Sequence, residues 1–190
     1  MKRAIIFLVA VAMVITAVGT AVAGSQSGDK EIQIQGSVSK FTNSEDDDTS
    51  TTTSVQLTFN YFFSPNISIG GTWWGNNSVT EPEDSDKSTT KTNFLLLRGD
   101  LYLGSATSKI VPYIGGHAGQ SSYTYESAGY DSSGSTSAYG WHGGLKIFAT
   151  ENTSWNLELN TTTYTPEAED GAKEIDFTNT QLLVGFSYYF

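Results

Sequence analysis

The chain has 190 residues, with 20 acidic residues against 10 basic ones, no cysteine, and 10 Phe, 10 Tyr and 4 Trp. This length allows a single domain. The lack of cysteine excludes disulfides, thiolate catalysis and cysteine-ligated metal centres. A formal net charge of -10 argues against nucleic-acid binding, because phosphates attract basic surfaces. The abundance of aromatic, Thr and Ser residues favours β-structure instead.

Residues 1–23 are predicted to be a secretory signal peptide. Lys2 and Arg3 precede an uncharged apolar run, and Ala21-Val22-Ala23 provides a small-residue cleavage site. The apolar run covers 15 residues, 4–18, which is shorter than the ~20 residues that span a bilayer as a helix. We expect cleavage after Ala23, which leaves residues 24–190 as the exported domain without a helical anchor.

Eight segments of the exported domain alternate between apolar and polar residues. Most are about ten residues long, the length of a tilted transmembrane strand. The second, fourth and sixth connections are short, whereas the first, third, fifth and seventh are long and polar. This rhythm predicts an antiparallel meander closed into a barrel. The expected strands are Glu31–Phe41, Ser54–Phe63, Ile67–Asn76, Thr92–Leu103, Ile110–Tyr125, Ala138–Phe148, Ser154–Tyr164 and Phe177–Phe190.

The two faces of each expected strand differ in character. In the last strand Leu182, Val184 and Phe186 share one face, while small and polar residues are interleaved with them. Small polar residues suit a narrow lumen, and large apolar residues suit lipid, so we predict an all-β, eight-stranded up-and-down transmembrane barrel. Aromatic residues near both strand ends are typical of membrane girdles. The expected girdles are Tyr61, Phe62, Phe63, Phe148, Trp155, Tyr188, Tyr189 and Phe190 at the short turns, and Trp73, Trp74, Phe94, Tyr123, Tyr125, Tyr139, Trp141, Tyr164 and Phe177 at the loops.

Charged residues within the strands are predicted to face the lumen. A charge facing lipid near the bilayer midplane would cost about 2–4 kcal/mol. His117 joins this set if the fifth strand keeps Tyr113 inward. An eight-stranded barrel is only wide enough for its own side chains, so we expect a structural, salt-linked plug; a polar path for ions or small solutes is the alternative. The predicted network is Arg98, Asp100, Lys146, Glu158, His142 and His117.

Three stretches resemble the eight-stranded outer-membrane barrels of the OmpA/OmpX/OmpW and opacity-protein type. Pro112–Gly119 resembles a glycine-rich strand common in that group, and Gly143–Leu159 resembles the hairpin that follows it. The last residues resemble the C-terminal aromatic signal that the barrel-assembly machinery recognises, and the matching residues are Gly185, Tyr188 and Phe190. The resemblance implies a bacterial outer-membrane barrel without a periplasmic domain. It also implies extracellular loops, periplasmic termini, contact with lipid and lipopolysaccharide, and a monomer.

Three functions are compatible with this resemblance, because the group is functionally mixed. The first is a non-enzymatic barrel for envelope integrity or surface interaction. The second is an OmpW-like passive conduit for small hydrophobic or polar molecules, with Trp74, Phe94 and Leu96 lining part of an apolar upper lumen. The third is an enzyme that modifies lipid A. The sequence offers two histidines and many serines, Ser121 and Ser122 among them, but no His-x-Ser pair, so we expect no catalytic residues and no cofactor.

The long connections carry 14 of the 20 acidic residues. We interpret them as solvated loops; a divalent-cation platform on lipopolysaccharide phosphates, or a surface for a cationic partner, is the alternative. The run Asp46–Asp48 lacks the spaced ligands of an EF-hand loop, so no metal site is predicted. The Ser/Gly-rich run Gly129–Ser137 is expected to be mobile. The acidic loop residues are Glu45, Asp46, Asp47, Asp48, Glu81, Glu83, Asp84, Asp86, Glu126, Asp131, Glu167, Glu169, Asp170 and Glu174.

Overall fold

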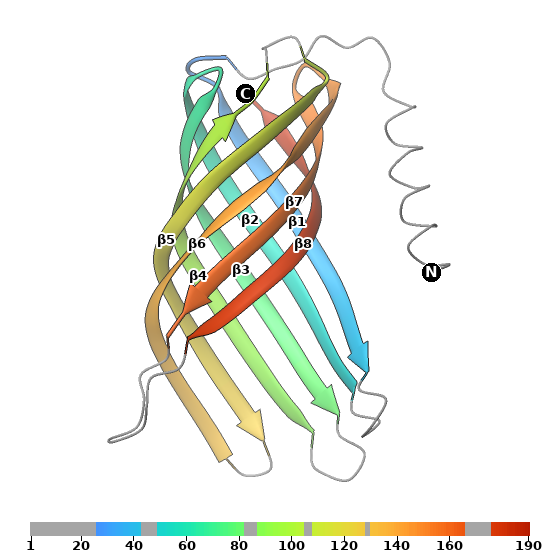
Figure 1. Ribbon diagram of the computed structural model, residues 1–190, viewed down its shortest axis with the longest axis vertical. Helices are drawn as coiled ribbons and strands as arrows, with labels where there is room; N and C mark the ends of the chain where they lie inside the picture. The colour runs from blue at the N-terminus through green and yellow to red at the C-terminus, as the bar shows by residue number, and fades with distance from the viewer. Residues whose placement is uncertain (1–25, 43–48, 82–86, 105–107, 128–129, 166–175) are drawn as a thin grey trace.

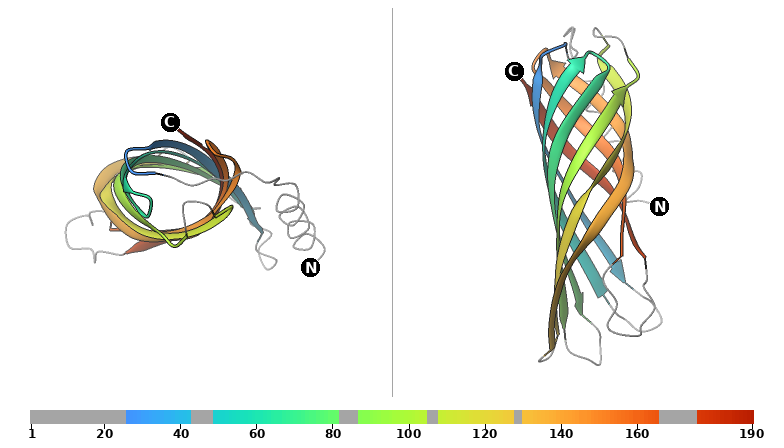
Figure 2. Two further views of the ribbon diagram at one scale, coloured as in Figure 1. Left: turned by 90° about the horizontal axis from the view of Figure 1, so that it is seen from above. Right: turned by 90° about the vertical axis from the view of Figure 1, so that its left-hand side faces the viewer.

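The computed structural model describes residues 26–42, 49–81, 87–104, 108–127, 130–165 and 176–190. Eight antiparallel strands close into a barrel in which each strand pairs with the next and β8 pairs with β1 (Figures 1 and 2). The predicted all-β barrel is therefore confirmed, while the predicted signal peptide lies outside the described residues. The strands are β1 (Lys30–Thr42), β2 (Thr49–Ser64), β3 (Ile67–Glu81), β4 (Ser88–Tyr102), β5 (Ile110–Ser127), β6 (Tyr130–Thr150), β7 (Thr153–Tyr164) and β8 (Phe177–Tyr189).

Tight turns gather at one end of the barrel. Pro65 and Asn66 join β2 to β3, and the Asn66 side chain donates hydrogen bonds to the carbonyl oxygens of Tyr102 and Gly104 at 2.8 and 3.0 Å. Asn152, in the turn between β6 and β7, donates to the Tyr189 carbonyl at 3.0 Å. Each turn is thus tied to the neighbouring strand pair. Within the described residues, no helix is long and apolar enough to cross a membrane.

The strands extend further toward the loop end than the sequence predicted. β6 begins at Tyr130, so residues 130–137 form a paired strand, and the expected mobile run is wrong there. The third and fifth connections are correspondingly shorter than expected. These extensions are rich in Ser and Thr, and a backbone ladder continues without apolar alternation. Gly134, which has no side chain, leaves room for the ring of Tyr123 across the ladder: a Cβ there would lie 2.6 Å from the Tyr123 hydroxyl.

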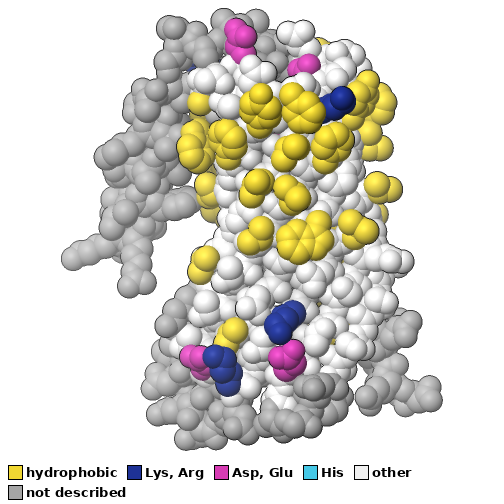
Figure 3. Space-filling view, turned by 180° about the vertical axis from the view of Figure 1, so that it is seen from behind, with side chains coloured by type: hydrophobic (Ala, Val, Ile, Leu, Met, Phe, Trp, Pro, Cys, Tyr) yellow, Lys and Arg dark blue, Asp and Glu magenta, His cyan; other side chains and the backbone are white. Residues whose placement is uncertain are grey.

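Large apolar side chains cover the outside of the barrel. Figure 3 shows them as a belt nearer the turn end, with polar and charged side chains beyond it at the loop end. Gln33, Gln56 and Asn60 are fully buried inside. This arrangement inverts that of a water-soluble protein and matches a barrel embedded in lipid. The belt includes Ile32, Ile34, Leu57, Phe59, Ile67, Ile69, Leu95, Leu97, Leu101, Ile114, Leu145, Leu159, Leu182 and Val184.

The predicted girdles are only partly correct. Tyr61 and Phe63 face outward, as do Trp73, Tyr139, Trp141, Trp155, Phe177, Tyr188 and Phe190. Adjacent residues of a strand point to opposite faces, so Phe62, between Tyr61 and Phe63, must face inward. Six residues assigned to the girdles pack inside the barrel instead: Phe62, Phe148, Tyr189, Trp74, Phe94 and Tyr164.

Candidate functional site

The barrel interior contains two apolar clusters with polar side chains between them. In the turn-side cluster the rings of Phe62 and Tyr102 have their centroids 5.1 Å apart. In the loop-side cluster Trp74 stacks on Phe94 at 4.7 Å. Both clusters fill space that the outer belt surrounds. The turn-side cluster is Phe62, Tyr102, Val111, Tyr113, Phe148 and Tyr189, and the loop-side cluster is Trp74, Phe94, Leu96 and Ala138 with Tyr164 against them.

Arg98 of β4 links the charged groups in the middle of the lumen. Its Nη2 donates to Asp100 Oδ1 at 3.0 Å and to Glu158 Oε2 at 3.1 Å, while its Nε donates to both Asp100 oxygens at 3.2 Å. Glu158 lies on β7, so this contact crosses the lumen. The Arg98 side chain is 2% exposed and both carboxylates are fully buried. Tyr113 also donates its hydroxyl hydrogen to Glu158 Oε2, at 2.8 Å.

A second buried ion pair joins Lys146 of β6 to Glu31 of β1. The Lys146 Nζ also lies 5.4–5.9 Å from the ring centroids of Tyr102, Tyr113 and Tyr189, at the face of the turn-side cluster. These rings add a cation–π contribution. Glu31 was not among the residues predicted for the lumen. Its parity with Gln33 and Gln35 was the available signal, because alternate residues of a strand share a face.

Two histidine rings stack beside Asp100. His142 Nε2 lies 2.5 Å from Asp100 Oδ1, and His142 Nδ1 lies 3.1 Å from His117 Nδ1. His117 Nε2 lies 2.8 Å from Thr162 Oγ1. The two rings are nearly parallel, at an interplanar angle of 13°. The structure therefore places all six residues of the predicted set inside the barrel, and direct contacts join Arg98, Asp100, Glu158, His142 and His117. Lys146 is linked to them through Glu31, because the Asn60 amide donates to Glu31 Oε2 at 3.0 Å and to Asp100 Oδ2 at 3.3 Å.

Inward-facing glycines make room for these side chains. A Cβ on Gly140 would lie 2.6 Å from His117 Nε2, and one on Gly144 would lie 2.9 Å from the Tyr113 hydroxyl. A Cβ on Gly115 would lie 2.6 Å from Asp100 Oδ1 and would also meet the His142 ring. The glycine-rich part of β5 and β6 is thus the wall against which the histidine pair fits.

The lumen side chains described above form ion pairs and hydrogen bonds with one another and do not place a nucleophile beside a histidine. The hydrogen bonds described for the two histidines go to each other, to Asp100 and to Thr162, and none goes to a serine hydroxyl. Ser121 is buried, and its Oγ has no hydrogen-bond partner in the structure. Among the described residues, no group of three or more His, Asp or Glu side chains is arranged to hold a metal ion.

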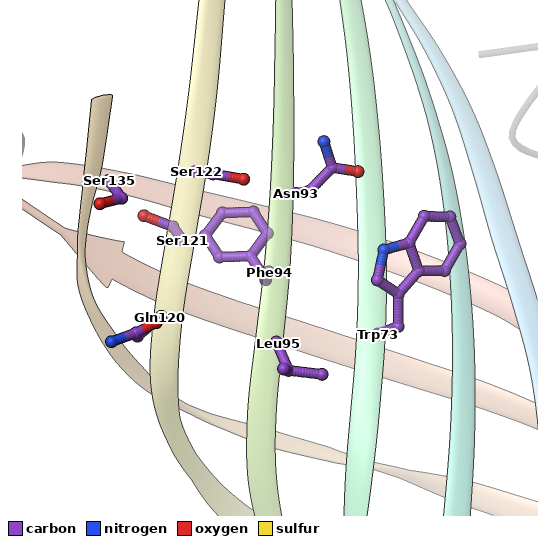
Figure 4. A pocket seen from close by; sticks show the side chains of 8 residues that line it. All are labelled: Trp73, Asn93, Phe94, Leu95, Gln120, Ser121, Ser122 and Ser135. Atoms are coloured by element: carbon purple, nitrogen blue, oxygen red, sulfur yellow. The ribbon is translucent and has the colours of Figure 1, made fainter. Parts of the chain in front are cut away.

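A shallow pocket of about 150 Å³ lies on the outer wall between β3 and β6 (Figure 4). Phe94 and Ser121 belong to the inward face and separate it from the lumen. The pocket carries no charged side chain, and it is not connected to the ion pairs through any of its residues. Its lining is Trp73, Asn93, Phe94, Leu95, Gln120, Ser121, Ser122 and Ser135.

Comparison with solved structures shows the same fold. The barrel is similar to Ail, the attachment invasion locus protein of Yersinia pestis, with a TM-score of 0.55 and 15% identity over 87% of this chain and 100% of that one. It is similar to Neisserial surface protein A, with a TM-score of 0.57 and 13% identity over 86% of this chain and all of the other. The N-terminal barrel domain of Pseudomonas aeruginosa OprF gives a TM-score of 0.50 at 14% identity, over 87% of this chain and 100% of that domain.

Sequence comparison identifies the family. No curated protein matches the chain significantly. The sequence model of the family described as "Outer membrane protein beta-barrel domain" matches residues 7–190. This match agrees with the outward apolar belt and the polar interior. The chain therefore belongs to the outer-membrane β-barrel family.

Proposed function

We propose that the protein is a non-enzymatic outer-membrane barrel with a closed lumen, serving envelope integrity or surface interaction. The observation that carries this proposal is the cross-lumen contact of Arg98 with Glu158 at 3.1 Å, between buried apolar clusters on either side. An eight-stranded barrel is just wide enough for its side chains to fill it. Ions or solutes would have to break buried ion pairs to pass.

The proposal includes an orientation and a set of partners. The long connections face the cell exterior, both termini face the periplasm, and the apolar belt contacts lipid and lipopolysaccharide. Cleavage after Ala23 releases the signal peptide, and the monomeric chain is inserted by the assembly machinery through Gly185, Tyr188 and Phe190. Supporting this, Tyr188 and Phe190 face outward at the turn end with ring centroids 6.2 Å apart, and Phe190 exchanges two backbone hydrogen bonds with Lys30.

Planar-bilayer recording tests the closed lumen. The purified protein is expected to give no steady conductance, because the ion pairs and apolar clusters leave no continuous aqueous path. A porin of about 16 strands, whose lumen is an aqueous channel, serves as the positive control in the same membrane. Stable single-channel steps from the wild-type protein, absent from mock-purified samples, would contradict the closed lumen and favour a conduit.

The conduit is the less favoured function. It needs an open apolar path in the loop-side lumen, and the predicted residues Trp74, Phe94 and Leu96 do meet there. However, Trp74 and Phe94 are 0% and 1% exposed and stack on each other. The space that the conduit requires is therefore filled with side chains.

The hypothesis that the protein is a lipid A-modifying enzyme is tested separately. Purified lipid A is expected to keep its mass after incubation with the protein in detergent and phospholipid, the latter as an acyl donor, because the histidines contact no serine hydroxyl. Mass spectrometry of lipid A before and after incubation is the measurement, with heat-unfolded protein as the control. Loss or gain of an acyl group only with folded protein would overturn the non-enzymatic assignment.

A further inference from the structure

The ladder between β1 and β8 is much shorter than the others. It pairs Glu31–Gly36 with Val184–Tyr189, six residue pairs, whereas every other ladder has 12 to 18. β1 nevertheless continues to Thr42, and β8 begins at Phe177. Figure 1 shows β1 and β8 side by side near the turn end and diverging toward the loop end. Two strand edges therefore face each other without pairing.

A cavity of about 410 Å³ lies where these edges separate, and we call it the seam slot. Strand parity places Val38, Leu182 and Val184 on its outer side, where they are exposed. The same parity places Ser37 and Gln181 on its inner side. The slot is thus apolar toward lipid and polar toward the lumen. Its lining is Gly36, Ser37, Val38, Ser39, Thr180, Gln181, Leu182 and Val184.

Side-chain hydrogen bonds span the inner side of the seam slot. Ser37 Oγ donates to Gln181 Oε1 at 3.3 Å, and Gln181 Nε2 donates to Asn76 Oδ1 at 3.4 Å. Ser54 Oγ donates to the same Asn76 oxygen at 2.6 Å. Asn76 is 8% exposed, yet its Nδ2 has no acceptor in the structure. Asn76 lies on β3 and does not itself line the slot, so the polar groups that the slot presents on its inner side are the Ser37 hydroxyl and the Gln181 amide.

The seam slot lies at the edge of the apolar belt. On β8 the outward residues change from Val184 and Leu182 to Thr180 and Thr178 along this stretch. Unpaired backbone groups that face hydrocarbon are costly, because no water is available to them. A ligand is favoured there if it brings hydrogen-bonding atoms to the inner side and an alkyl chain to the outer side.

We propose that the seam slot binds one uncharged, single-chain amphiphile from the surrounding leaflet. Its ester, amide or hydroxyl head lies against the Ser37 hydroxyl and the Gln181 amide, and its alkyl chain runs out over Val38 and Leu182. The head is uncharged because none of the eight lining residues carries a charge that could compensate one. The volume falls within the range of about 300–1,000 Å³ that is usual for small-ligand sites. The site is in the barrel wall, so it does not depend on whether the lumen is closed.

Photolabelling of the full barrel in phosphatidylcholine nanodiscs tests this site. The probe is a monoacylglycerol with a diazirine on its alkyl chain, and labelled residues are mapped by mass spectrometry. Label is expected to concentrate on residues 37–39 and 180–184 and to be displaced by unlabelled monolauroylglycerol. Lauric acid, with a charged carboxylate head, is expected to compete about tenfold less well. Even labelling around the belt, or equal competition by lauric acid, would overturn the proposal.

A pair of matched variants separates the slot from general lipid contact. Ser39→Phe places a ring in the slot and is expected to lower the competed label about tenfold. Ser137→Phe adds the same ring at an exposed position of β6 that does not line the slot, and it is expected to leave the label unchanged. Both variants are first checked for the heat-dependent gel mobility of a folded barrel. Equal loss of label in both folded variants would contradict the site, and the wild-type competition remains decisive if either misfolds.

Discussion

Replacing Glu158 with Ala is expected to lower the free energy of unfolding by about 3–5 kcal/mol, because it leaves a buried cation short of a partner. Arg98 would keep Asp100 as its remaining carboxylate. The Tyr113 hydroxyl and the Gln56 amide would lose the acceptors they contact at 2.8 and 3.2 Å. Urea unfolding of the barrel in detergent, followed by Trp fluorescence, measures the loss, and the temperature at which the folded gel band disappears should fall with it.

A matched surface carboxylate provides the control for Glu158. Glu126 contacts Lys91 at 3.2 Å, and both side chains are about half exposed. Glu126→Ala is therefore expected to change the free energy of unfolding by about 0–1 kcal/mol. The double variant Arg98→Met with Glu158→Leu is expected not to recover the loss, because it also removes the arginine that pairs with the buried Asp100 carboxylate. Equal effects of Glu158→Ala and Glu126→Ala would show that the lumen pairing contributes no net stability.

Gly115→Ala is expected to destabilise the barrel by about 1–3 kcal/mol through overpacking. The added methyl group would lie 2.6 Å from Asp100 Oδ1 and would meet the His142 ring and the backbone oxygen of Gly99. The Gly99 oxygen is part of the wall of β4, so it cannot rotate away as a side chain can. The measurement is urea unfolding together with the yield of folded barrel after refolding into detergent.

The neighbouring glycine supplies the control for this prediction. Gly116 faces outward, and a Cβ there would have its nearest contact 3.6 Å away, at the Gly140 oxygen. Gly116→Ala is therefore expected to refold like the wild type. Gly140→Ala, which would crowd His117 Nε2, should behave like Gly115→Ala. A normal refolding yield and unchanged unfolding for both inward variants would show that the histidine pair has more room than the structure gives it.

The sequence predicted the barrel and its inward charges for one physical reason. A strand has a period of two, and lipid penalises a charge on the outer face, so the register of Arg98, Asp100 and Glu158 followed from the apolar residues between them. The same rule could have placed Phe62 inside, since it lies between the outward residues Tyr61 and Phe63. Grouping aromatic residues by their height along the strand, without parity, assigned it to the girdle instead.

Other features were beyond the reach of apolar periodicity. The loop-end extensions of β2, β3, β4 and β6 consist largely of Ser, Thr and Asn, so no apolar alternation marks them as strands and only the backbone ladder defines them. The end of pairing between β1 and β8 at Gly36 and Val184 is likewise a property of two segments distant in sequence. Three acidic residues assigned to the connections, Glu81, Glu126 and Asp131, belong instead to β3, β5 and β6. The acidic residues of 43–48, 82–86 and 166–175 lie outside the described residues, so their role as solvated loops stays a prediction.

The strands differ in length, so at the loop end of the barrel the sheet extends further on the side of β4, β5 and β6 than on the side of β7. β4 and β5 stay paired up to Ser88 and Ser127, and β6 accompanies them to Tyr130, whereas β7 stops at Tyr164. Gly119 of β5 pairs with Ala138, which pairs with Tyr164 at the end of β7, so it marks the level at which β7 stops. Beyond Gly119, β5 continues for eight residues to Ser127, or about 26 Å along the strand at ~3.3 Å per residue. A molecule approaching the loop end would therefore meet a paired, hydroxyl-rich wall of sheet at β4 to β6 and a much lower edge of sheet at β7.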